Sequence, residues 1–196
     1  MIYDNLLNNE ELKTLADLIT GLDFPWFFQP NIAYKLTHGE EVDPNVIQSF
    51  GLTHLVWDTE QGKVSEILGN MVPVIEAFKE ISGVEINNFL RIKINLQTPI
   101  IGNTPEKYNG AHVDRYVAHK TLIFFPIESD GDFIIFNETF DENIKDSYPP
   151  LISPIVSQRV IPKANRLVYL ENGHTYHTSS NPINFSTRYS INFNFN

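Results

Sequence analysis

Two one-sided hydrophobic stripes in the first half of the chain predict helices. The first stripe has apolar residues at helical spacing over about residues 8–20, and Gly21 is the expected end of that helix. The second stripe covers about residues 64–81 and ends before Gly83, with Pro73 inside the pattern as an expected kink. Because each stripe occupies one side of its helix, we expect both helices to pack on a sheet.

After about residue 85 the pattern changes to short β-rich runs that are separated by turn-forming residues. No internal repeat or linker divides the chain, so we expect one domain over residues 1–196. Residues 1–86 then supply supporting helices and strands, and residues 87–196 form a mainly β core, a sandwich or barrel with the helices against one sheet. The expected strands of the core are FLRIKINL, GAHVD, KTLIFFPI, DFIIF, PIVSQRVI, RLVYL, TYHTS and TRYSINFNF.

The last of these strands alternates between polar and apolar residues. Successive residues of a strand lie on opposite faces, so one face is polar and the other is apolar. The apolar face suits packing beneath the helices, whereas the polar face points into the barrel, where the charge of Arg188 requires an anionic partner. The polar face carries Arg188, Ser190, Asn192 and Asn194, and the apolar face carries Tyr189, Ile191, Phe193 and Phe195.

The composition limits both the chemistry and the partners. The chain has no cysteine, which excludes disulfides, zinc ribbons and iron–sulfur clusters and leaves histidine and carboxylate side chains as metal ligands. The formal net charge of −10 disfavours nucleic acid and anionic membrane surfaces as partners. The N-terminus lacks the pattern of a signal peptide, and no apolar run reaches the roughly 20 residues of a membrane helix. We therefore expect a soluble cytoplasmic protein.

A His-x-Asp pair is the strongest candidate for chemistry. In an extended strand His112 and Asp114 project from the same side, so their ligand atoms converge on one ion. His177 is the expected third ligand and His174 is the alternative; they are three apart in an expected strand, so only one of them faces the site. Two histidines and one carboxylate form the facial triad of non-haem Fe(II) oxygenases, which leaves three positions for substrate, co-substrate or O₂.

Arg188 and Ser190 follow His177 along the chain and are candidates for binding a co-substrate. The guanidinium offers a planar fork that matches a carboxylate, and the serine hydroxyl adds one more donor. A dicarboxylate such as 2-oxoglutarate chelates iron through its keto and C1-carboxylate oxygens. Its far carboxylate is then free to reach Arg188 and Ser190 deeper in the barrel.

The order of these motifs resembles the 2-oxoglutarate/Fe(II)-dependent dioxygenases, especially their prolyl 4-hydroxylase-like branch. The resemblance covers about residues 87–196 and rests on HVD, HKTLIFFPI, SDGDFIIF, NRLVYLENGHTYH and STRYSINFNF. It implies a double-stranded β-helix, or jelly-roll, fold and a hydroxylase that converts 2-oxoglutarate to succinate and CO₂ while it oxidises a substrate C–H bond. A prolyl residue of a peptide or protein is the substrate this branch favours, and a free amino acid, another protein residue or a small metabolite fits the same residues.

Three positions depart from the prolyl hydroxylase pattern. Asn95 stands where that family usually has a tyrosine, and Phe125 stands where a second family tyrosine falls. Arg188 takes the place of a frequent lysine, as in other oxygenase branches. These departures leave the oxygenase prediction intact and count against a prolyl substrate. Asn95 and Thr121 are further candidates for cofactor binding.

Two other functions fit the same residues. A cupin-like metal enzyme, such as an isomerase or a ring-cleaving dioxygenase, keeps the metal and does not use 2-oxoglutarate. Many such sites use an additional His or Glu ligand, and none is evident near His112. A non-catalytic jelly-roll binding module keeps only a vestigial site, and the intact set of ligands counts against it.

The remaining histidines, aromatic residues and acidic segments are expected to have ordinary roles. The histidines without a partner pattern are His38, His54 and His119. The aromatic residues expected in the core are Trp26, Phe27, Phe28, Tyr34 and Trp57. The acidic segments 40–43 and 141–146 are expected to be solvated loops.

Overall fold

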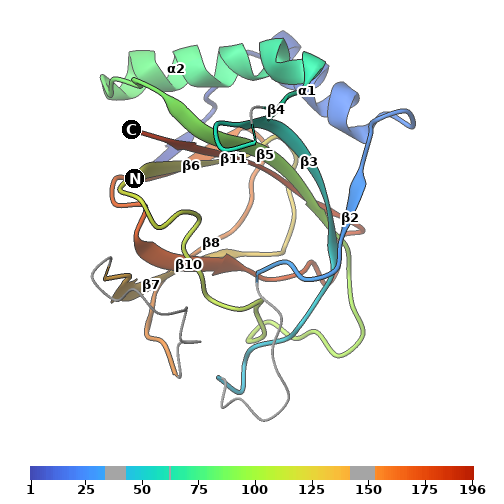
Figure 1. Cartoon of the computed structure of the whole chain (residues 1–196). Coiled ribbons are helices and arrows are strands. Elements are labelled where there is room, and N and C mark those ends of the chain that lie inside the picture. Colours follow the sequence, from blue (N-terminus) through green and yellow to red (C-terminus); the bar gives the residue numbers. More distant parts are fainter. Residues whose placement is uncertain (34–42, 62, 142–152) are drawn as a thin grey trace.

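The computed structural model describes residues 1–33, 43–61, 63–141 and 153–196. Within these ranges the chain forms two antiparallel sheets, and the helices α1 (Asn9–Thr20) and α2 (Val72–Ser82) cover the outer face of the larger sheet (Figure 1). The strands are β1 (Ile2–Asp4), β2 (Phe27–Gln29), β3 (Gly51–Asp58), β4 (Lys63–Val64), β5 (Phe89–Gln97), β6 (Lys120–Phe125), β7 (Phe133–Thr139), β8 (Val156–Val160), β9 (Arg166–Leu170), β10 (Thr175–Ser179) and β11 (Arg188–Phe195).

The order of strands places the last strand, β11, in the middle of the larger sheet and the first strand, β1, at its edge. The larger sheet has the order β1-β9-β6-β11-β5-β3-β2 with β4 paired to β3, and the smaller sheet has the order β10-β7-β8. The expected mainly β fold with helices on one sheet is confirmed. Because β1 to β4 also belong to the larger sheet, residues 1–86 contribute strands to the same sheet as well as the helices that cover it.

Local sequence explains where α1 begins. The Asn8 side chain accepts hydrogen bonds from the backbone N–H groups of Glu10 and Glu11, both at 3.0 Å. The Glu11 carboxylate in turn accepts from the backbone N–H of Asn8 at 3.2 Å, which completes a capping box. The helix predicted over residues 8–20 is confirmed.

The second helical segment differs from the single kinked helix predicted over residues 64–81. Glu66–Met71 form a 3₁₀ helix, and α2 begins only at Val72, with Pro73 in its first turn. Proline has no N–H to donate to an earlier carbonyl, so a continuous α-helix through this position loses a hydrogen bond, whereas the first turn of a helix needs no such donor. Gly83 ends α2 in the left-handed conformation, at φ 68°.

The main hydrophobic core lies between the helices and the larger sheet. Phe78 of α2 packs against Tyr169 of β9 and Phe195 of β11, with ring centroids 5.2 and 6.3 Å apart. Ile191 and Phe193 are fully buried on the same face of β11. The apolar face of the last strand therefore packs beneath the helices as predicted. The opposite, polar face of β11 and of its neighbour β5 is left to line a cavity.

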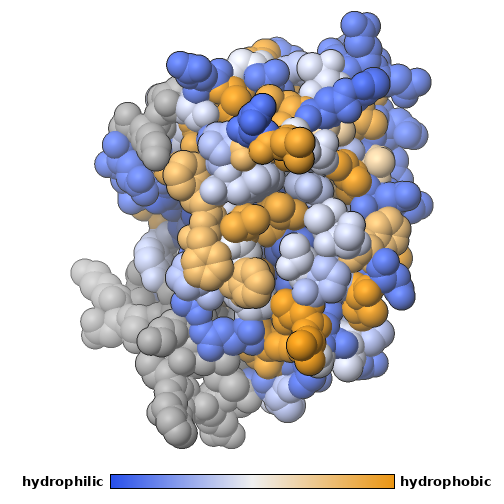
Figure 2. All heavy atoms as spheres, turned by 90° about the vertical axis from the view of Figure 1, so that its right-hand side faces the viewer, coloured by the Kyte–Doolittle hydropathy of each residue, from blue (hydrophilic) through white to orange (hydrophobic). Residues whose placement is uncertain are grey.

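The N-terminal aromatic residues divide between core and surface. Trp26 and Trp57 pack against the core as expected. Phe27 and Phe28 are 55% and 66% exposed, so the prediction of a core position was wrong for them. The reason is that β2 is a three-residue strand at the edge of the larger sheet, where its side chains face solvent on one side. Apolar side chains are accordingly visible on the face of the molecule that carries β2 (Figure 2).

Some of the predicted features fall outside the described residues. They are Tyr34, His38 and most of the acidic segments 40–43 and 141–146. Their expected roles stay predictions. Neither described helix combines the length and the apolar character that crossing a membrane requires.

Candidate metal centre

The centre is built on one backbone bridge. His177 lies in β10, and its N–H donates to the carbonyl of His112 at 2.9 Å while its own carbonyl accepts from the N–H of His112 at 3.0 Å. Residues 110–114 form no strand beyond this bridge, which corrects the prediction of a short strand there. β10 shifts register between Thr175 and His177, and such a bulge interrupts regular pairing at that point.

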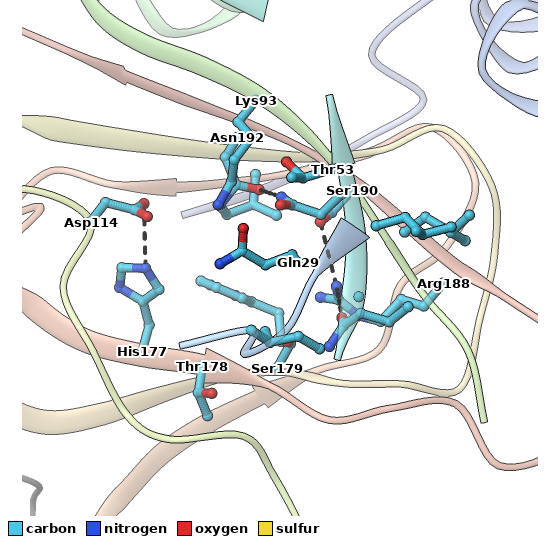
Figure 3. A pocket seen from close by; sticks show the side chains of 18 of the residues that line it. Gln29, Thr53, Lys93, Asp114, His177, Thr178, Ser179, Arg188, Ser190 and Asn192 are labelled. Carbon is cyan, nitrogen blue, oxygen red and sulfur yellow. Dashed lines mark hydrogen bonds and ion pairs between the residues drawn. The ribbon is translucent and has the colours of Figure 1, made fainter. Parts of the chain in front are cut away.

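The bridge brings the predicted ligands together. One ligand atom from each of His112, Asp114 and His177 lies within 4.8 Å of the other two. Asp114 Oδ2 is 3.5 Å from His177 Nε2 (Figure 3). His174, the alternative third ligand, is not part of this group, and its Nε2 lies 3.0 and 3.1 Å from two backbone carbonyl oxygens instead. The choice between the two histidines therefore falls on His177.

Hydrogen bonds set the tautomers of both imidazoles. Nδ1 of His112 donates to the carbonyl of Gly110 at 3.0 Å, and Nδ1 of His177 donates to the carbonyl of Thr175 at 2.9 Å. A carbonyl can only accept, so the proton of each neutral ring lies on Nδ1 and the lone pair lies on Nε2. This is the arrangement in which metal-ligating histidines are oriented by a backbone acceptor.

The set of donor atoms fits a divalent cation. His177 Nε2 is buried and has no hydrogen-bond partner among the described residues, although a carboxylate oxygen of Asp114 faces it. A lone pair and a carboxylate turned toward each other repel unless a cation or a proton lies between them. Two imidazole nitrogens and one carboxylate are the ligands that non-haem iron(II) takes in a facial arrangement.

Burial and charge favour the metal-binding forms of these groups. Burial, followed by the nearby His177, lowers the pKa of His112 to about 4, so its imidazole is neutral at pH 7. Burial by itself raises the pKa of Asp114, but Arg91 and His177 outweigh it and hold that pKa well below its usual range. The centre therefore offers a neutral imidazole and an ionised carboxylate without any change of pH.

Asp114 is held by two side chains from the larger sheet. Arg91 of β5 forms an ion pair with Asp114 Oδ1. Asn194 of β11 donates to Asp114 Oδ2 at 2.9 Å and also to Thr121 Oγ1 at 3.1 Å. The side-chain oxygen of Asn194, Oδ1, accepts a hydrogen bond from Arg91 Nε at 3.2 Å. The arginine and the asparagine therefore orient each other as well as the carboxylate. These contacts fix the orientation of the carboxylate of one candidate metal ligand.

A cavity leads from the three ligands to Arg188. The polar faces of β5 and β11 form one wall, and Thr178 and Ser179 of β10 lie on the other side (Figure 3). Three buried polar atoms in its lining have no hydrogen-bond partner among the described residues: Thr53 Oγ1, Gln97 Nε2 and His177 Nε2. Buried polar atoms are almost always paired, so this concentration of unpaired atoms indicates a place for a polar ligand.

Arg188 lies at the far end of the cavity, where it supplies a positive charge. The residue is only 2% exposed. Its Nε donates to the carbonyl of Gly131 at 2.6 Å, and Nη1 donates to Gln97 Oε1 at 2.8 Å and reaches Ser190 Oγ at 3.4 Å. In the described part of the chain no carboxylate forms an ion pair with it; Asp132, whose charge favours the protonated form of Arg188, pairs with Arg159 instead. Burial lowers the pKa of Arg188 to about 10, which still leaves it charged at pH 7.

The other predicted cofactor residues take different positions. Ser190 and Asn95 both line the cavity, and Asn95 Nδ2 donates to Asn192 Oδ1 at 3.2 Å. Thr121 is fully buried beside Asn194 and is not among the lining residues. Its hydroxyl accepts a hydrogen bond from Asn194, the residue that also donates to Asp114. That it contacts a co-substrate stays a prediction. Phe125 lies under the Arg188 guanidinium, 5.3 Å from it.

Apart from Asn95, the sequence reasoning missed the part of the site that β5 supplies. Arg91, Lys93, Asn95 and Gln97 alternate along β5 with buried apolar residues, and all four face the metal end, the cavity or Arg188. The same period-2 pattern that identified the polar face of β11 was present in FLRIKINLQ. Gln29 and Thr53 also line the cavity, and no pattern in the sequence distinguished them.

The two unassigned histidines are structural in the described contacts. His54 is buried, with Nδ1 2.9 Å from the carbonyl oxygen of Pro25 and Nε2 2.9 Å from Ser65 Oγ. His119 lies outside the cavity, with Nδ1 bonded to the carbonyl of Val117 at 2.8 Å. Both observations agree with the ordinary roles expected for them.

Comparison with solved structures shows the fold. A prolyl-4-hydroxylase from Pseudomonas putida superposes with a TM-score of 0.54 at 14% sequence identity, over 100% of this chain and 91% of that one. A prolyl hydroxylase from Trichoplax adhaerens, bound to a hypoxia inducible factor peptide, gives 0.58 at 12% identity, over 100% and 82% of the chains. The non-haem α-ketoglutarate-dependent epimerase SnoN gives 0.57 at 9% identity, over 100% and 77%.

No family model matches the chain, and no curated protein matches its sequence. The likenesses are therefore to three-dimensional structures and establish the architecture. The chain has the jelly-roll fold of the 2-oxoglutarate/Fe(II) oxygenases, as the order of its motifs predicted.

Proposed function

We propose that the protein is a dioxygenase that requires Fe(II) and 2-oxoglutarate, with His112, Asp114 and His177 as the metal ligands. The observation that carries the proposal is the pairing of two features in one cavity. Three ligand atoms lie within 4.8 Å of one another at one end, and a buried arginine without a described carboxylate partner lies at the other. This is the charge distribution that a chelating dicarboxylate requires.

Arg188 and Ser190 bind the far carboxylate of 2-oxoglutarate in this proposal. Gln97 adds a donor, because its buried Nε2 has no hydrogen-bond partner among the described residues while its Oε1 accepts from Arg188. A carboxylate placed there gains charge-assisted hydrogen bonds and neutralises a buried cation. The support from Gly131 and Gln97 holds the guanidinium in place before the ligand arrives.

The bound iron and co-substrate supply the oxidising chemistry: 2-oxoglutarate, O₂ and a substrate C–H bond become succinate, CO₂ and a C–OH group. The chain contributes position and environment. The two Nδ1 protons are donated to backbone carbonyls, so each imidazole presents Nε2 to the metal. Arg91 and Asn194 hold the Asp114 carboxylate ionised and in one orientation.

A prolyl residue of a peptide or protein is our first candidate for the substrate, because two of the structural neighbours are named prolyl hydroxylases. Another neighbour was solved with Fe3+, α-ketoglutarate and nogalamycin RO, so the fold also accommodates small-molecule substrates. Asn95 in place of a tyrosine counts against prolyl specificity. The substrate assignment is thus separate from the assignment of metal and co-substrate.

A cupin-like metal enzyme is the main rival. Within the described residues the group of possible ligands contains three side chains and no fourth His or Glu, which supports the facial triad over a four-ligand site. The buried Arg188 has no role in that rival. A non-catalytic module is the second rival, and the intact triad with its oriented tautomers counts against it.

Anaerobic titration tests the proposal. Purified protein with one equivalent of Fe(II) is expected to develop a weak visible charge-transfer band when 2-oxoglutarate is added, and to form succinate after O₂ is admitted. Iron binding without the band or succinate would favour the cupin-like enzyme. Absence of stoichiometric metal binding would favour the non-catalytic module.

A further inference from the structure

Lys93 lies where the cavity opens toward the surface. It belongs to β5, between Arg91 and Asn95 on the polar face of the strand. It lines the cavity that leads to Arg188 (Figure 3) and also an outer groove, whose lining includes Asp58 and Arg115. The residues that line both spaces are Gln29, Ile32, Thr53, Lys93, His112 and Asp114. Lys93 therefore stands beside the candidate metal centre at the junction of the two spaces.

The other two described cations that line the outer groove already have carboxylate partners. Arg91 pairs with Asp114, and Arg115 pairs with Asp58 and Glu60. For Lys93, by contrast, no hydrogen bond or ion pair is found with any residue in the ranges that the structure describes. A half-buried ammonium without a partner is unfavourable, because it loses hydration and gains nothing in return.

Asp114 does not serve as the missing partner. Its Oδ1 is occupied by Arg91, and its Oδ2 accepts from Asn194 and faces His177. Burial, followed by the positive charge of Arg91, lowers the pKa of Lys93 to about 8, which leaves most of the population charged at pH 7. The side chain thus presents a positive charge to the cavity and has no acceptor among the residues that the structure describes.

We propose that Lys93 is a second carboxylate anchor, which binds a carboxylate lying beside the metal ligands. The inference rests on the proposed function, since that function places a chelating dicarboxylate in this cavity. Two carboxylates fit the chemistry: the C1 carboxylate of 2-oxoglutarate, and a carboxylate of the primary substrate that enters through the outer groove. Arg188 anchors the far end of the co-substrate, and Lys93 binds negative charge at the end where the reaction occurs.

The test compares Lys93→Met, which keeps the length of the side chain, with Lys93→Arg, which keeps the charge. Lys79→Met is the matched control, because Lys79 lies on the surface of α2 and pairs only with Glu76 among the described residues. Thermal unfolding of each variant first establishes that it is folded. All measurements use the Fe(II)-loaded protein without oxygen.

The first arm measures the dissociation constant of 2-oxoglutarate from the charge-transfer band. If Lys93 binds the C1 carboxylate, Lys93→Met weakens binding by about 10- to 100-fold, as expected for loss of a hydrogen bond between charged groups, and Lys93→Arg restores most of it. Lys79→Met leaves the constant unchanged.

The second arm uses acetate as the smallest carboxylate probe, with acetamide as its neutral match. Each is titrated into the protein with and without bound 2-oxoglutarate, and binding near the iron is read from paramagnetic broadening of the methyl resonance. If Lys93 binds a substrate carboxylate, acetate is broadened more than acetamide in the presence of 2-oxoglutarate, and Lys93→Met removes the difference.

The proposal is overturned if Lys93→Met changes neither the 2-oxoglutarate constant nor the preference for acetate. That result is distinct from failure of the proposed function, which appears in the unmodified protein as absence of the charge-transfer band. In that case acetate binding to the iron-loaded protein still reports on Lys93, because the second arm does not require 2-oxoglutarate.

Discussion

His112 and His177 exchange both of their backbone hydrogen bonds, at 2.9 and 3.0 Å, although they come from distant parts of the chain. This single bridge fixes the separation of the two imidazoles independently of any metal. Their Nδ1 atoms are bonded to carbonyls two residues earlier, so each ring is also fixed in rotation. The two histidines of the candidate metal centre are thus organised largely by backbone contacts.

Replacing His177 by alanine is expected to abolish stoichiometric Fe(II) binding and succinate formation. The variant loses one of the three candidate ligands, and that ligand is only 2% exposed. His174→Ala is the matched control, because His174 lies three residues away and outside the ligand group, and it is expected to keep iron binding. Metal analysis and an assay for succinate measure both effects. Equal loss in the two variants would contradict the assignment of His177.

Arg188→Met is expected to raise the KM for 2-oxoglutarate by about 10- to 100-fold, because it removes the charge-assisted hydrogen bonds to the far carboxylate. The Tm is expected to change little, since an apolar side chain avoids the cost of burying a charge. Arg166→Met serves as control: Arg166 binds Asp4 at 2.6 and 2.7 Å on β9, away from the cavity. If 2-oxoglutarate dependence were unchanged in Arg188→Met, the cofactor assignment would be wrong.

Asn194→Ala is expected to weaken iron binding by about 10- to 100-fold, as is typical for loss of a group that orients a metal ligand. It removes the donor to Asp114 Oδ2 and frees Arg91 Nε. Thr121→Val removes only the acceptor for Asn194 and is expected to have a smaller effect on iron affinity. Isothermal titration with Fe(II) measures both. A raised KM for 2-oxoglutarate in Thr121→Val at unchanged iron affinity would instead support the predicted co-substrate contact.

The metal-free protein is expected to lose stability as the pH falls from 7 to 5. Burial lowers the pKa of His112 from 6.5 to about 4, so in this range the unfolded chain takes up a proton that the folded protein does not. Stability therefore falls as pH drops through the unfolded pKa, by about 2 kcal/mol between pH 7 and pH 5 for this one group.

Urea unfolding at several pH values measures this loss. His112→Asn is the reference, because the other titrating groups are common to both proteins and only the difference between the two pH profiles reports on His112. Parallel profiles in the wild type and His112→Asn would show that the imidazole titrates normally in the folded state.

Several features were predictable from sequence because they depend on local periodicity. The polar and apolar faces of β11 follow from residues two apart, and the structure places Phe193 in the core and Arg188 in the cavity accordingly. The same rule applied to FLRIKINLQ identifies Arg91, Lys93 and Gln97 as residues of the polar face. The motif His-x-Asp and the position of His177 were also sufficient to name the three candidate ligands.

Other features were decided by tertiary contacts. Residues 110–114 were expected to be a strand, but they have a single pairing partner, and Pro73 divided a predicted helix because helical hydrogen bonding depends on the position of the missing N–H. Phe27 and Phe28 have the composition of core residues and are exposed because β2 lies at the edge of its sheet.

The sequence by itself determined which side chains share a face of a strand, because alternation is a property of consecutive residues. Only the tertiary structure decided that β5 and β11 are neighbours in a register that pairs Arg91 with Asn194 and Gln97 with Arg188. Strand order and register arise from contacts between distant segments, which no local pattern specifies. Those contacts place the support of Asp114 at one end of the polar face and the buried Arg188 at the other.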